Sequence, residues 1–389
     1  MSSLEIRQLG DVCTQDRVSV KAGERGDLRY IGLEGIEAET GSFIEGELSK
    51  TPDAPKANSF YFTSRHVLYG KLRPYLNKVA TPEFEGKCST EIIPLLPAES
   101  LNRDYLAYFL RSPQVVSRIS RQTAGARMPR ADMGVVLGLE IPVPTLNDQH
   151  SIVDILKRAD GIRRLRKQAQ DTTRQLIPAL FVDMFGDPAT NSKRWPETTI
   201  GEAIKSADYG SSTKASDDGA GLPLIRMGNV DYSGRLDLTE LKYVQLPDDQ
   251  IAKYRLSEGD ILFNRTNSKD LVGKTGLWFG STEAVAASYF IRVRVDRSVL
   301  NPFYLWAFMN SGHMKRVLFD TARGAIGQSN INAKELRAFH LPLPPASLQN
   351  RFEQRCRDLF ALEVQGVSAA SKNESVFQAL LHRAFSDIR

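Results

Sequence analysis

The sequence has few residues of the kinds that hold metals or form disulfide bonds. Its three cysteines, Cys13, Cys88 and Cys356, lie far apart without a CxxC spacing, and its five histidines show no HExxH pattern. Zinc sites need such spacings, so we predict no metal site. The sequence also lacks a run of eighteen apolar residues, and residues 1–7 contain no apolar segment typical of a secretory signal. We therefore expect a cytoplasmic protein that does not span a membrane.

Composition allows two domains but does not by itself indicate a ligand. The chain has 389 residues and 41% apolar content, which is enough to give each of two domains its own core. The formal charge of +5 is only mildly positive for a protein that binds nucleic acid. The positions of the charged residues are therefore more informative than their number.

One stretch of the sequence occurs twice, about 200 residues apart. Ile-Pro-Val-Pro at 141–144 leads to Gln149 and a long charged helical pattern, and Leu-Pro-Leu-Pro at 341–344 leads to Gln349 and another. Other segments match in the same order, namely 30–36 with 224–230, 67–71 with 261–265, 101–106 with 300–305, 124–126 with 323–325, and 176–185 with 376–385. The shared order predicts a tandem duplication whose differences are loop insertions.

Each repeat begins with a β-rich domain. In the first repeat, short strand-like segments broken by turn residues lie at 28–33, 60–62, 67–69 and 91–96. One helix is predicted within this domain, from the favoured N-cap residue Asn102 to Ser112, because apolar residues recur there at helical spacing.

Each repeat ends in a long predicted helix, the first from about Asn147 and the second from about Ser347. Pro178 is expected to kink the first helix or to begin a second short one. Gly366 costs the second helix about 1 kcal/mol relative to alanine, so this helix needs a partner. The first helix carries apolar residues at three-and-four spacing, which predict a coiled-coil-like seam of Ile152, Ile155, Ala159, Ile162, Leu165, Ala169, Thr172 and Leu176.

Together these patterns predict an α+β fold. It contains two duplicated β-rich domains, each followed by a long helix, and the two helices pair as an antiparallel coiled coil that relates the domains by an approximate two-fold axis. The predicted segments are 1–145 for the first domain, 146–188 for the first helix region, 189–345 for the second domain and 346–389 for the second helix region.

Three local patterns would suit an enzyme, and each has a simpler explanation. Asn-Pro-Phe-Tyr at 301–304 resembles a motif of amino-group methyltransferases, but the repeat places it at a helix start, and the chain has no Phe-x-Gly-x-Gly cofactor loop. Gly-Lys-Thr at 273–275 lacks the upstream glycine of a P-loop, because Ser268 stands there. The third pattern resembles a nuclease triplet and consists of Asp231, Glu240 and Lys242, but the first repeat has no counterpart to it.

Basic residues are concentrated in one part of the first repeat. Five arginines fall between 111 and 130 without one acidic residue, at Arg111, Arg118, Arg121, Arg127 and Arg130. Such a concentration suits DNA phosphates, although a solvated helix face followed by a basic loop is the alternative. Further basic residues follow the strand at 67–69. The candidate DNA-binding residues of this repeat are Lys71, Arg73, Lys78, Arg121, Arg127 and Arg130.

The second repeat carries different polar residues after the matched strand. Two domains that read different DNA sequences on one scaffold would require such differences, although neutral variation in surface loops is the alternative. Residues 323–330 are also rich in groups that read base edges. The candidate DNA-binding residues of this repeat are Lys214, Arg226, Asn264, Arg265, Lys269, Lys274, Arg323 and Gln328.

The doubled domain, the proline-containing closures followed by glutamine and a long helix, and the Phe-Val-Asp-Met-Phe-Gly-Asp-Pro ending at 181–188 resemble the specificity subunit of type I restriction-modification systems. The similarity runs from about residue 4 to residue 385. It implies a non-catalytic protein whose two target-recognition domains each read half of a split double-stranded DNA site.

The resemblance also implies partners. The long helices would hold the two domains apart and dock two adenine-N6 methyltransferase subunits, which carry the S-adenosylmethionine that this chain does not itself bind. Restriction (motor-nuclease) subunits would be further, optional members of the complex. A stand-alone DNA-modifying or DNA-cutting enzyme is the alternative function.

Overall fold

The computed structural model describes residues 5–48, 58–123, 127–217, 219–268, 271–280, 282–322 and 329–385. It divides into two compact units, of which unit 1 comprises Met1–Gln168 and Val367–Arg389, and unit 2 comprises Ala169–Gly366. Each unit thus combines one repeat with the beginning of its own long helix and the end of the other repeat's helix. The predicted segments follow chain order, whereas the compact units divide both long helices in the middle.

The main sheet of each unit has four antiparallel strands in the same order. In unit 1 the order is β2 (Cys13–Gln15), β9 (Ile92–Pro97), β6 (Val67–Gly70) and β7 (Val79–Ala80). In unit 2 it is β12 (Ile204–Tyr209), β19 (Phe290–Val295), β15 (Ile261–Asn264) and β17 (Thr275–Leu277). This shared topology confirms the predicted duplication.

A second sheet in each unit contains one parallel pair. Unit 1 has the order β3 (Ser19–Val20), β5 (Ser59–Phe62), β8 (Gly86–Ser89) and β4 (Arg29–Ile31), with β4 parallel to β8. Unit 2 has β14 (Lys242–Val244), β13 (Leu222–Ile225) and β18 (Val285–Ala286), with β13 parallel to β18. The two-stranded sheets pair β1 (Glu5–Gln8) with β10 (Glu140–Val143), β11 (Glu197–Thr199) with β21 (His340–Pro342), and β16 (Thr266–Asn267) with β20 (Ser329–Asn330).

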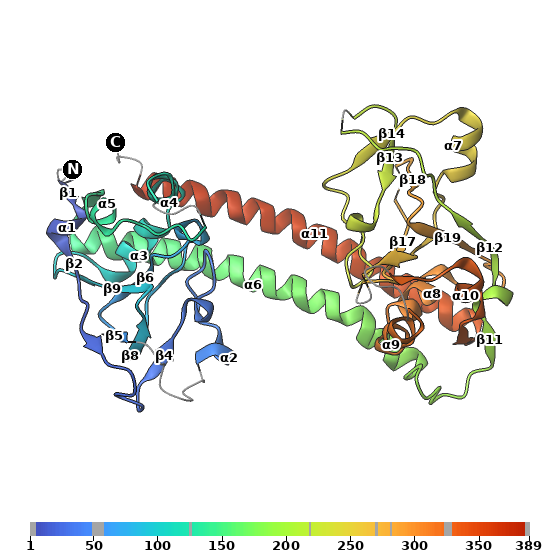
Figure 1. The fold of residues 1–389 in the computed structure, drawn as a ribbon, viewed down its shortest axis with the longest axis horizontal. Helices are drawn as coiled ribbons and strands as arrows, with labels where there is room; N and C mark the ends of the chain where they lie inside the picture. The colour runs from blue at the N-terminus through green and yellow to red at the C-terminus, as the bar shows by residue number, and fades with distance from the viewer. Residues whose placement is uncertain are drawn as a thin grey trace. The chain divides into compact units, whose positions relative to one another are not determined.

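Short helices complete each unit (Figure 1). Those of unit 1 are α1 (Leu9–Val12), α2 (Glu45–Leu48), α3 (Arg103–Arg111), α4 (Pro113–Arg121) and α5 (Met133–Leu137), with 3₁₀ turns η1 (Leu33–Gly35) and η2 (Pro74–Leu76). Those of unit 2 are α7 (Asp248–Tyr254), α8 (Pro302–Met309), α9 (Gly312–Thr321) and α10 (Ala333–Ala338), with η3 (Ile200–Glu202) and η4 (Met227–Asn229). The long helices are α6 (Leu146–Phe185) and α11 (Ala346–Phe385).

Helices α3 and α8 both begin at a capping asparagine. The side-chain oxygen of Asn102 accepts hydrogen bonds from the backbone N–H groups of Asp104 and Tyr105, at 2.9 and 3.0 Å. The side-chain oxygen of Asn301 accepts one from the N–H of Phe303 at 2.9 Å. These bonds satisfy donors that have no partner inside the helix. The structure therefore confirms that the Asn-Pro-Phe-Tyr segment is a helix start.

The repeated proline motif is joined to its helix by a buried glutamine. In unit 1, Gln149 donates to the carbonyls of Pro144 and Ser100 at 2.9 and 3.0 Å and accepts from the N–H of Asn102 at 2.7 Å. In unit 2, Gln349 donates to the carbonyls of Pro344 and Val299 at 2.8 and 3.4 Å and accepts from the N–H of Asn301 at 2.8 Å. We call these two arrangements the glutamine clamps. Each one fixes the rotation of a long helix against its domain, because three bonds hold one side chain.

A tyrosine reinforces each closure. The Tyr105 hydroxyl of α3 donates to the Pro142 carbonyl at 3.0 Å, and the Tyr304 hydroxyl of α8 donates to the Pro342 carbonyl at 2.6 Å. Both rings also meet a phenylalanine from the end of a long helix. The ring of Phe385 lies 5.1 Å from that of Tyr105, and the ring of Phe185 lies 4.8 Å from that of Tyr304.

Within each unit the two long helices run antiparallel. In unit 1, Arg163 of α6 pairs with Glu374 of α11 at 2.7 Å, and the core contains Val153 and Leu156 together with Phe377, Leu381 and Phe385. In unit 2, Arg174 of α6 pairs with Glu363 of α11 at 3.4 Å, and the core contains Ile177 and Phe181 together with Phe352, Cys356 and Phe360. The predicted antiparallel pairing is therefore present in both units.

The predicted seam of α6 was only partly right, because Ile152 and Ala159 pack half-buried against the core of unit 1 but other members are exposed. Ile155, Ile162 and Leu165 are 51%, 50% and 68% exposed, whereas Val153 and Leu156 are buried. The glutamine clamp explains the difference, because Val153 and Leu156 lie four and seven residues after Gln149 and share its face of the helix. Helix α6 also continues through Pro178, so the predicted second short helix does not occur. None of the helices in the described ranges is both long and apolar enough to cross a bilayer.

Candidate nucleic-acid interface

The two units can be compared at one matched position, directly after β6 in unit 1 and β15 in unit 2. In unit 1 the backbone of Lys71 bonds to that of Glu91 at 2.9 Å and to that of Ala131 at 2.8 Å. In unit 2 the backbone of Arg265 bonds to that of Tyr289 at 2.9 Å and to that of Ile331 at 3.0 Å. Strand pairing matches as well, because Leu72 opposes Arg130 and Thr266 opposes Asn330. We call these surroundings the reading point of each unit.

At the reading point of unit 1 an acid holds both cations. The Arg130 guanidinium donates to both carboxylate oxygens of Glu91, with a shortest separation of 2.9 Å, and the Lys71 amine lies 4.0 Å from the same carboxylate. The hydrogen bonds and charge of Glu91 raise the pKa of Arg130. A phosphate or base would have to compete with Glu91 for both side chains.

At the reading point of unit 2 the arginine is held without an acid. The Arg265 guanidinium carbon lies 4.6 Å from the centre of the Tyr209 ring, and its Nε donates to the Asn330 side-chain oxygen at 3.2 Å. The Thr266 hydroxyl donates to the same oxygen at 3.3 Å. Tyr209 is 44% exposed, so this cluster lies at the surface. Within the described ranges, no acidic side chain forms an ion pair with Arg265.

The other basic residues predicted to bind DNA in unit 1 fall into two groups, those that are exposed and those that bond to groups of the fold. Arg73, Arg121 and Arg127 are exposed, Arg73 at the turn before η2 and Arg121 at the end of α4. Lys78, in contrast, donates its amine to the Leu33 carbonyl at 2.6 Å. The Arg111 guanidinium lies 4.5 Å from the Tyr108 ring and donates to the Thr40 carbonyl, and its burial lowers its pKa. Arg111 therefore stabilises the fold, which corrects the prediction for it, whereas Lys78 is half-buried and its DNA contact stays a prediction.

In unit 2 two predictions were wrong. Lys274 is buried and donates its amine to the carbonyls of Met227 and Val230, at 2.9 and 2.5 Å, and burial lowers its pKa. Asn264 is fully buried at the end of β15, so its amide is out of reach of DNA. Lys214 is exposed and Arg226 is half-buried. The remaining predicted residues, Lys269, Arg323 and Gln328, lie outside the described residues.

Sequence reasoning missed the residues that position Arg265. Asn330 was noted only as part of a polar segment, and Tyr209 was not singled out at all. Tyr209 precedes Arg265 by more than fifty residues, and a surface tyrosine in a strand has the same sequence signal as a core one. Only the antiparallel path β12-β19-β15 brings it near Arg265.

The patterns that suggested an enzyme are structural. Lys242 donates to Asp217 at 3.0 Å, and the Asp231 carboxylate accepts backbone N–H groups of its own turn. The Cys13 and Cys356 thiols are buried, and burial raises the pKa of each to about 12, so neither is a thiolate nucleophile near neutral pH. In the part of the chain that the structure describes, no cluster of three or more His, Cys, Asp or Glu side chains could hold a metal ion.

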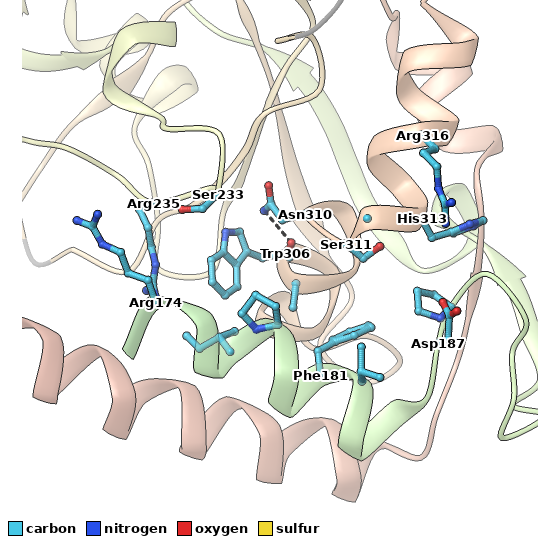
Figure 2. Close-up of a pocket in the computed structure, with 16 residues that line it drawn as sticks. Arg174, Phe181, Asp187, Ser233, Arg235, Trp306, Asn310, Ser311, His313 and Arg316 are labelled. Carbon is cyan, nitrogen blue, oxygen red and sulfur yellow. Dashed lines mark hydrogen bonds between the residues drawn. The ribbon is translucent and has the colours of Figure 1, made fainter. Parts of the chain in front are cut away.

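Unit 2 contains a pocket of about 640 Å³ between the end of α6 and the turn from α8 to α9. Figure 2 shows the Trp306 ring above this end of α6, with Arg174 and Arg316 toward opposite ends of the pocket. In unit 1 the rings of Tyr108 and Phe377 lie 6.4 Å apart at the positions that correspond to Ala307 and Ile177 in unit 2.

Comparison with known sequences shows that both repeats match the model of one protein family. The family model described as the type I restriction modification DNA specificity domain matches residues 1–172 and 193–355. The specificity subunit of the type I restriction enzyme EcoKI from Escherichia coli K12 is 23% identical over 310 residues, which cover 75% of this chain and 66% of that protein. The StySPI specificity subunit from Salmonella potsdam is 24% identical over 308 residues, with the same coverage. The match thus spans just under two thirds of each of these curated relatives.

Solved structures show the same fold along nearly the whole chain. The S subunit of a type I restriction-modification system from M. genitalium has a TM-score of 0.59 at 15% identity, covering 99% of this chain and 97% of that one. A chain from a structure concerning complex assembly and conformational transition of a type I R-M system has a TM-score of 0.58 at 20% identity, covering 99% and 98%.

Proposed function

The chain belongs to the type I restriction modification DNA specificity domain family, and we propose that it is the non-catalytic specificity subunit of a type I restriction-modification complex. The observation that carries this function is the matched reading point. Two units of the same topology present Lys71, Arg130 and Glu91 in one and Arg265, Asn330 and Tyr209 in the other. Each unit reads its own half of a split double-stranded DNA site.

Affinity and specificity come from different side chains. Exposed arginines such as Arg73, Arg121 and Arg127 neutralise phosphates and hold the duplex whatever its sequence. The side chains at the two reading points contact base edges, where the major groove distinguishes all four base pairs. The shared sheets supply one scaffold, so a change at one reading point leaves the other unit's half-site unaltered.

The long helices dock two adenine-N6 methyltransferase subunits, one on each unit. Ile162 on α6 and Leu362 on α11 occupy corresponding positions of the repeat and are 50% and 58% exposed. In unit 1, Ile155 and Leu165 extend the apolar surface around Ile162. Exposed apolar residues grouped on one helix face mark a protein–protein contact. The methyltransferase binds S-adenosylmethionine and performs the chemistry, and restriction subunits are optional further members of the complex.

The helices also set the gap between the two half-sites, since α6 and α11 each contribute residues to both units. A helix rises ~1.5 Å per residue, so the number of residues between the units converts into a number of base pairs. The alternative function, a stand-alone DNA-modifying or DNA-cutting enzyme, requires its own cofactor loop or metal cluster.

The purified chain alone will therefore transfer no methyl group from labelled S-adenosylmethionine to DNA and will leave supercoiled plasmid intact. The same chain mixed with its adenine-N6 methyltransferase partner will label adenine in a bipartite motif. Label incorporated by the chain alone, above a control without protein, would overturn the proposal in favour of the stand-alone enzyme.

A further inference from the structure

Arg265 is built to read one base, and we propose that it recognises a guanine in the half-site of unit 2. This inference rests on the proposed function and makes it more specific. It assigns Arg265 as the specificity-determining residue, with Tyr209 and Asn330 as positioning residues. The argument depends on which atoms of Arg265 are already engaged and which remain.

The backbone of Arg265 is fixed on both sides. Its N–H donates to the Tyr289 carbonyl at 2.9 Å, and its carbonyl accepts from the Ile331 N–H at 3.0 Å. Arg265 also directly follows β15, whose residues pair with both β17 and β19. The side chain therefore starts from a rigid point, which a recognition contact needs.

The side chain is fixed as well. The guanidinium carbon lies 4.6 Å from the centre of the Tyr209 ring, and Nε donates to the Asn330 oxygen at 3.2 Å. The Thr266 hydroxyl donates to that oxygen at 3.3 Å and so orients the Asn330 amide. An arginine held in this way has lost most of its rotamer freedom before it meets DNA, so binding loses less side-chain entropy.

The atoms that remain are the two terminal nitrogens of the fork. Within the described ranges, neither Nη of Arg265 has a protein acceptor, and Nε is used by Asn330. Two parallel N–H donors match the O6 and N7 acceptors of guanine, which together occur on no other base in the major groove. Adenine offers only one acceptor there, and thymine and cytosine do not offer this pair.

The equivalent position in unit 1 lacks this arrangement. Lys71 offers a flexible ammonium in place of a planar fork, and its amine lies 4.0 Å from Glu91, which also binds Arg130. Lysine is a point charge, whereas the planar fork of arginine specifies two acceptors. The inference therefore applies to the half-site of unit 2 alone.

The main competing assignment for Arg265 is a phosphate, which also accepts two parallel N–H bonds. A phosphate contact tolerates lysine, because charge supplies most of its energy. A guanine contact with lysine loses the rigid planar fork that matches O6 and N7 together, so it discriminates less between bases. Arg265→Lys therefore separates the two assignments. Asn330→Ala and Tyr209→Leu remove only the positioning groups.

The test uses the full chain assembled with its methyltransferase, and long-read sequencing of modified DNA gives the recognised motif for each variant. Arg265→Lys should relax a single G·C pair in one half-site, lowering discrimination at that pair by about 10- to 100-fold. The other half-site and the salt dependence of binding should not change. Asn330→Ala and Tyr209→Leu should relax the same pair by smaller factors. Lys71→Ala in unit 1 is the matched control, and it should leave that pair unaltered.

Three results would overturn the inference. The first is an unchanged motif in Arg265→Lys, which indicates a phosphate contact because lysine keeps the charge. The second is relaxation at a pair other than G·C, and the third is relaxation in both half-sites. Circular dichroism and thermal unfolding must first show that each variant folds as the unaltered chain does. Failure of the proposed function is distinguishable, because the unaltered complex would then methylate no bipartite motif, and the inference would fall with it.

Discussion

The two units share the same closure between domain and long helix, and they differ at their reading points. Gln149 and Gln349 make the same three bonds, and Tyr105 and Tyr304 make the same bond to the first proline of the motif. The reading points differ, because unit 1 has an ion-paired cluster around Glu91, whereas unit 2 has an arginine stacked on Tyr209. This contrast separates the residues that hold each domain on its helix from those that we propose distinguish one DNA sequence from another.

Lengthening both helices at the boundary between the units gives the largest expected change. The boundary falls at Ala169 in α6 and at Gly366 in α11, so four residues inserted at each place leave the contacts inside each unit intact. The insertion adds about 6 Å and slightly more than one helical turn. At ~3.4 Å per base pair, the gap in the methylated motif should grow by one or two base pairs while both half-sites stay the same.

Sequencing of methylated DNA measures this change, after native mass spectrometry has shown that the complex still assembles. If the assembled complex keeps its original gap, the helices do not set the distance between half-sites.

Changes at the matched apolar positions test whether each unit docks one methyltransferase. Ile162→Asp and Leu362→Asp each place a charge on an exposed apolar surface, so each should weaken one docking site by more than about tenfold. Native mass spectrometry should then show one bound methyltransferase for either variant and none for the double variant. Gln175→Asp, an exposed position of α6, is the control and should keep two. Loss of both subunits from a single variant would argue against one site per unit.

Removing the glutamine clamps tests whether the two closures are equivalent. Gln149→Leu and Gln349→Leu each leave three partly buried backbone groups without their side-chain partner, so each should lower the free energy of unfolding by about 2–4 kcal/mol. Gln349→Leu should cost slightly less, because the bond to Val299 is longer than the one to Ser100. Urea unfolding gives both values, and an effect below about 0.5 kcal/mol for either variant would show that its clamp is dispensable.

The smallest effect expected is the loss of one phosphate contact. Arg121→Ala should weaken binding to all DNA sequences several-fold and reduce the salt slope by about one contact. Lys274→Met is the informative comparison, because the Lys274 amine is bonded inside unit 2. It should lower stability and leave the salt slope unchanged. Fluorescence anisotropy at several salt concentrations measures both, and equal slopes for Arg121→Ala and the unaltered chain would remove Arg121 from the interface.

The sequence predicted the duplication and the positions of its elements because these depend on local signals. Asn102 and Asn301 cap helices that begin within one residue of the expected place, and the strands at 60–62 and 67–69 occur as β5 and β6. The seam of α6 could not be found in this way, because the clamp at Gln149 decides which face of the helix is buried.

The candidate site was predictable only in part for the same reason. Charge suggested Lys274, yet the fold buries its amine against two carbonyls. Asn264 followed the matched strand, yet it lies inside unit 2. Arg265 was found from its position after the strand, but its partners Tyr209 and Asn330 come from distant segments. Contacts between segments far apart in the chain decide which polar residues remain available to DNA.

The most direct test of independent reading replaces residues 195–340 with the corresponding region of another family member whose motif is known. Both chains are assembled with the same methyltransferase, and the methylated motifs are determined by long-read sequencing. We expect one half of the motif to change to that of the donor protein, while the other half and the gap stay the same. A change in both half-sites, or in neither, would contradict the account of two units that each read half of the site.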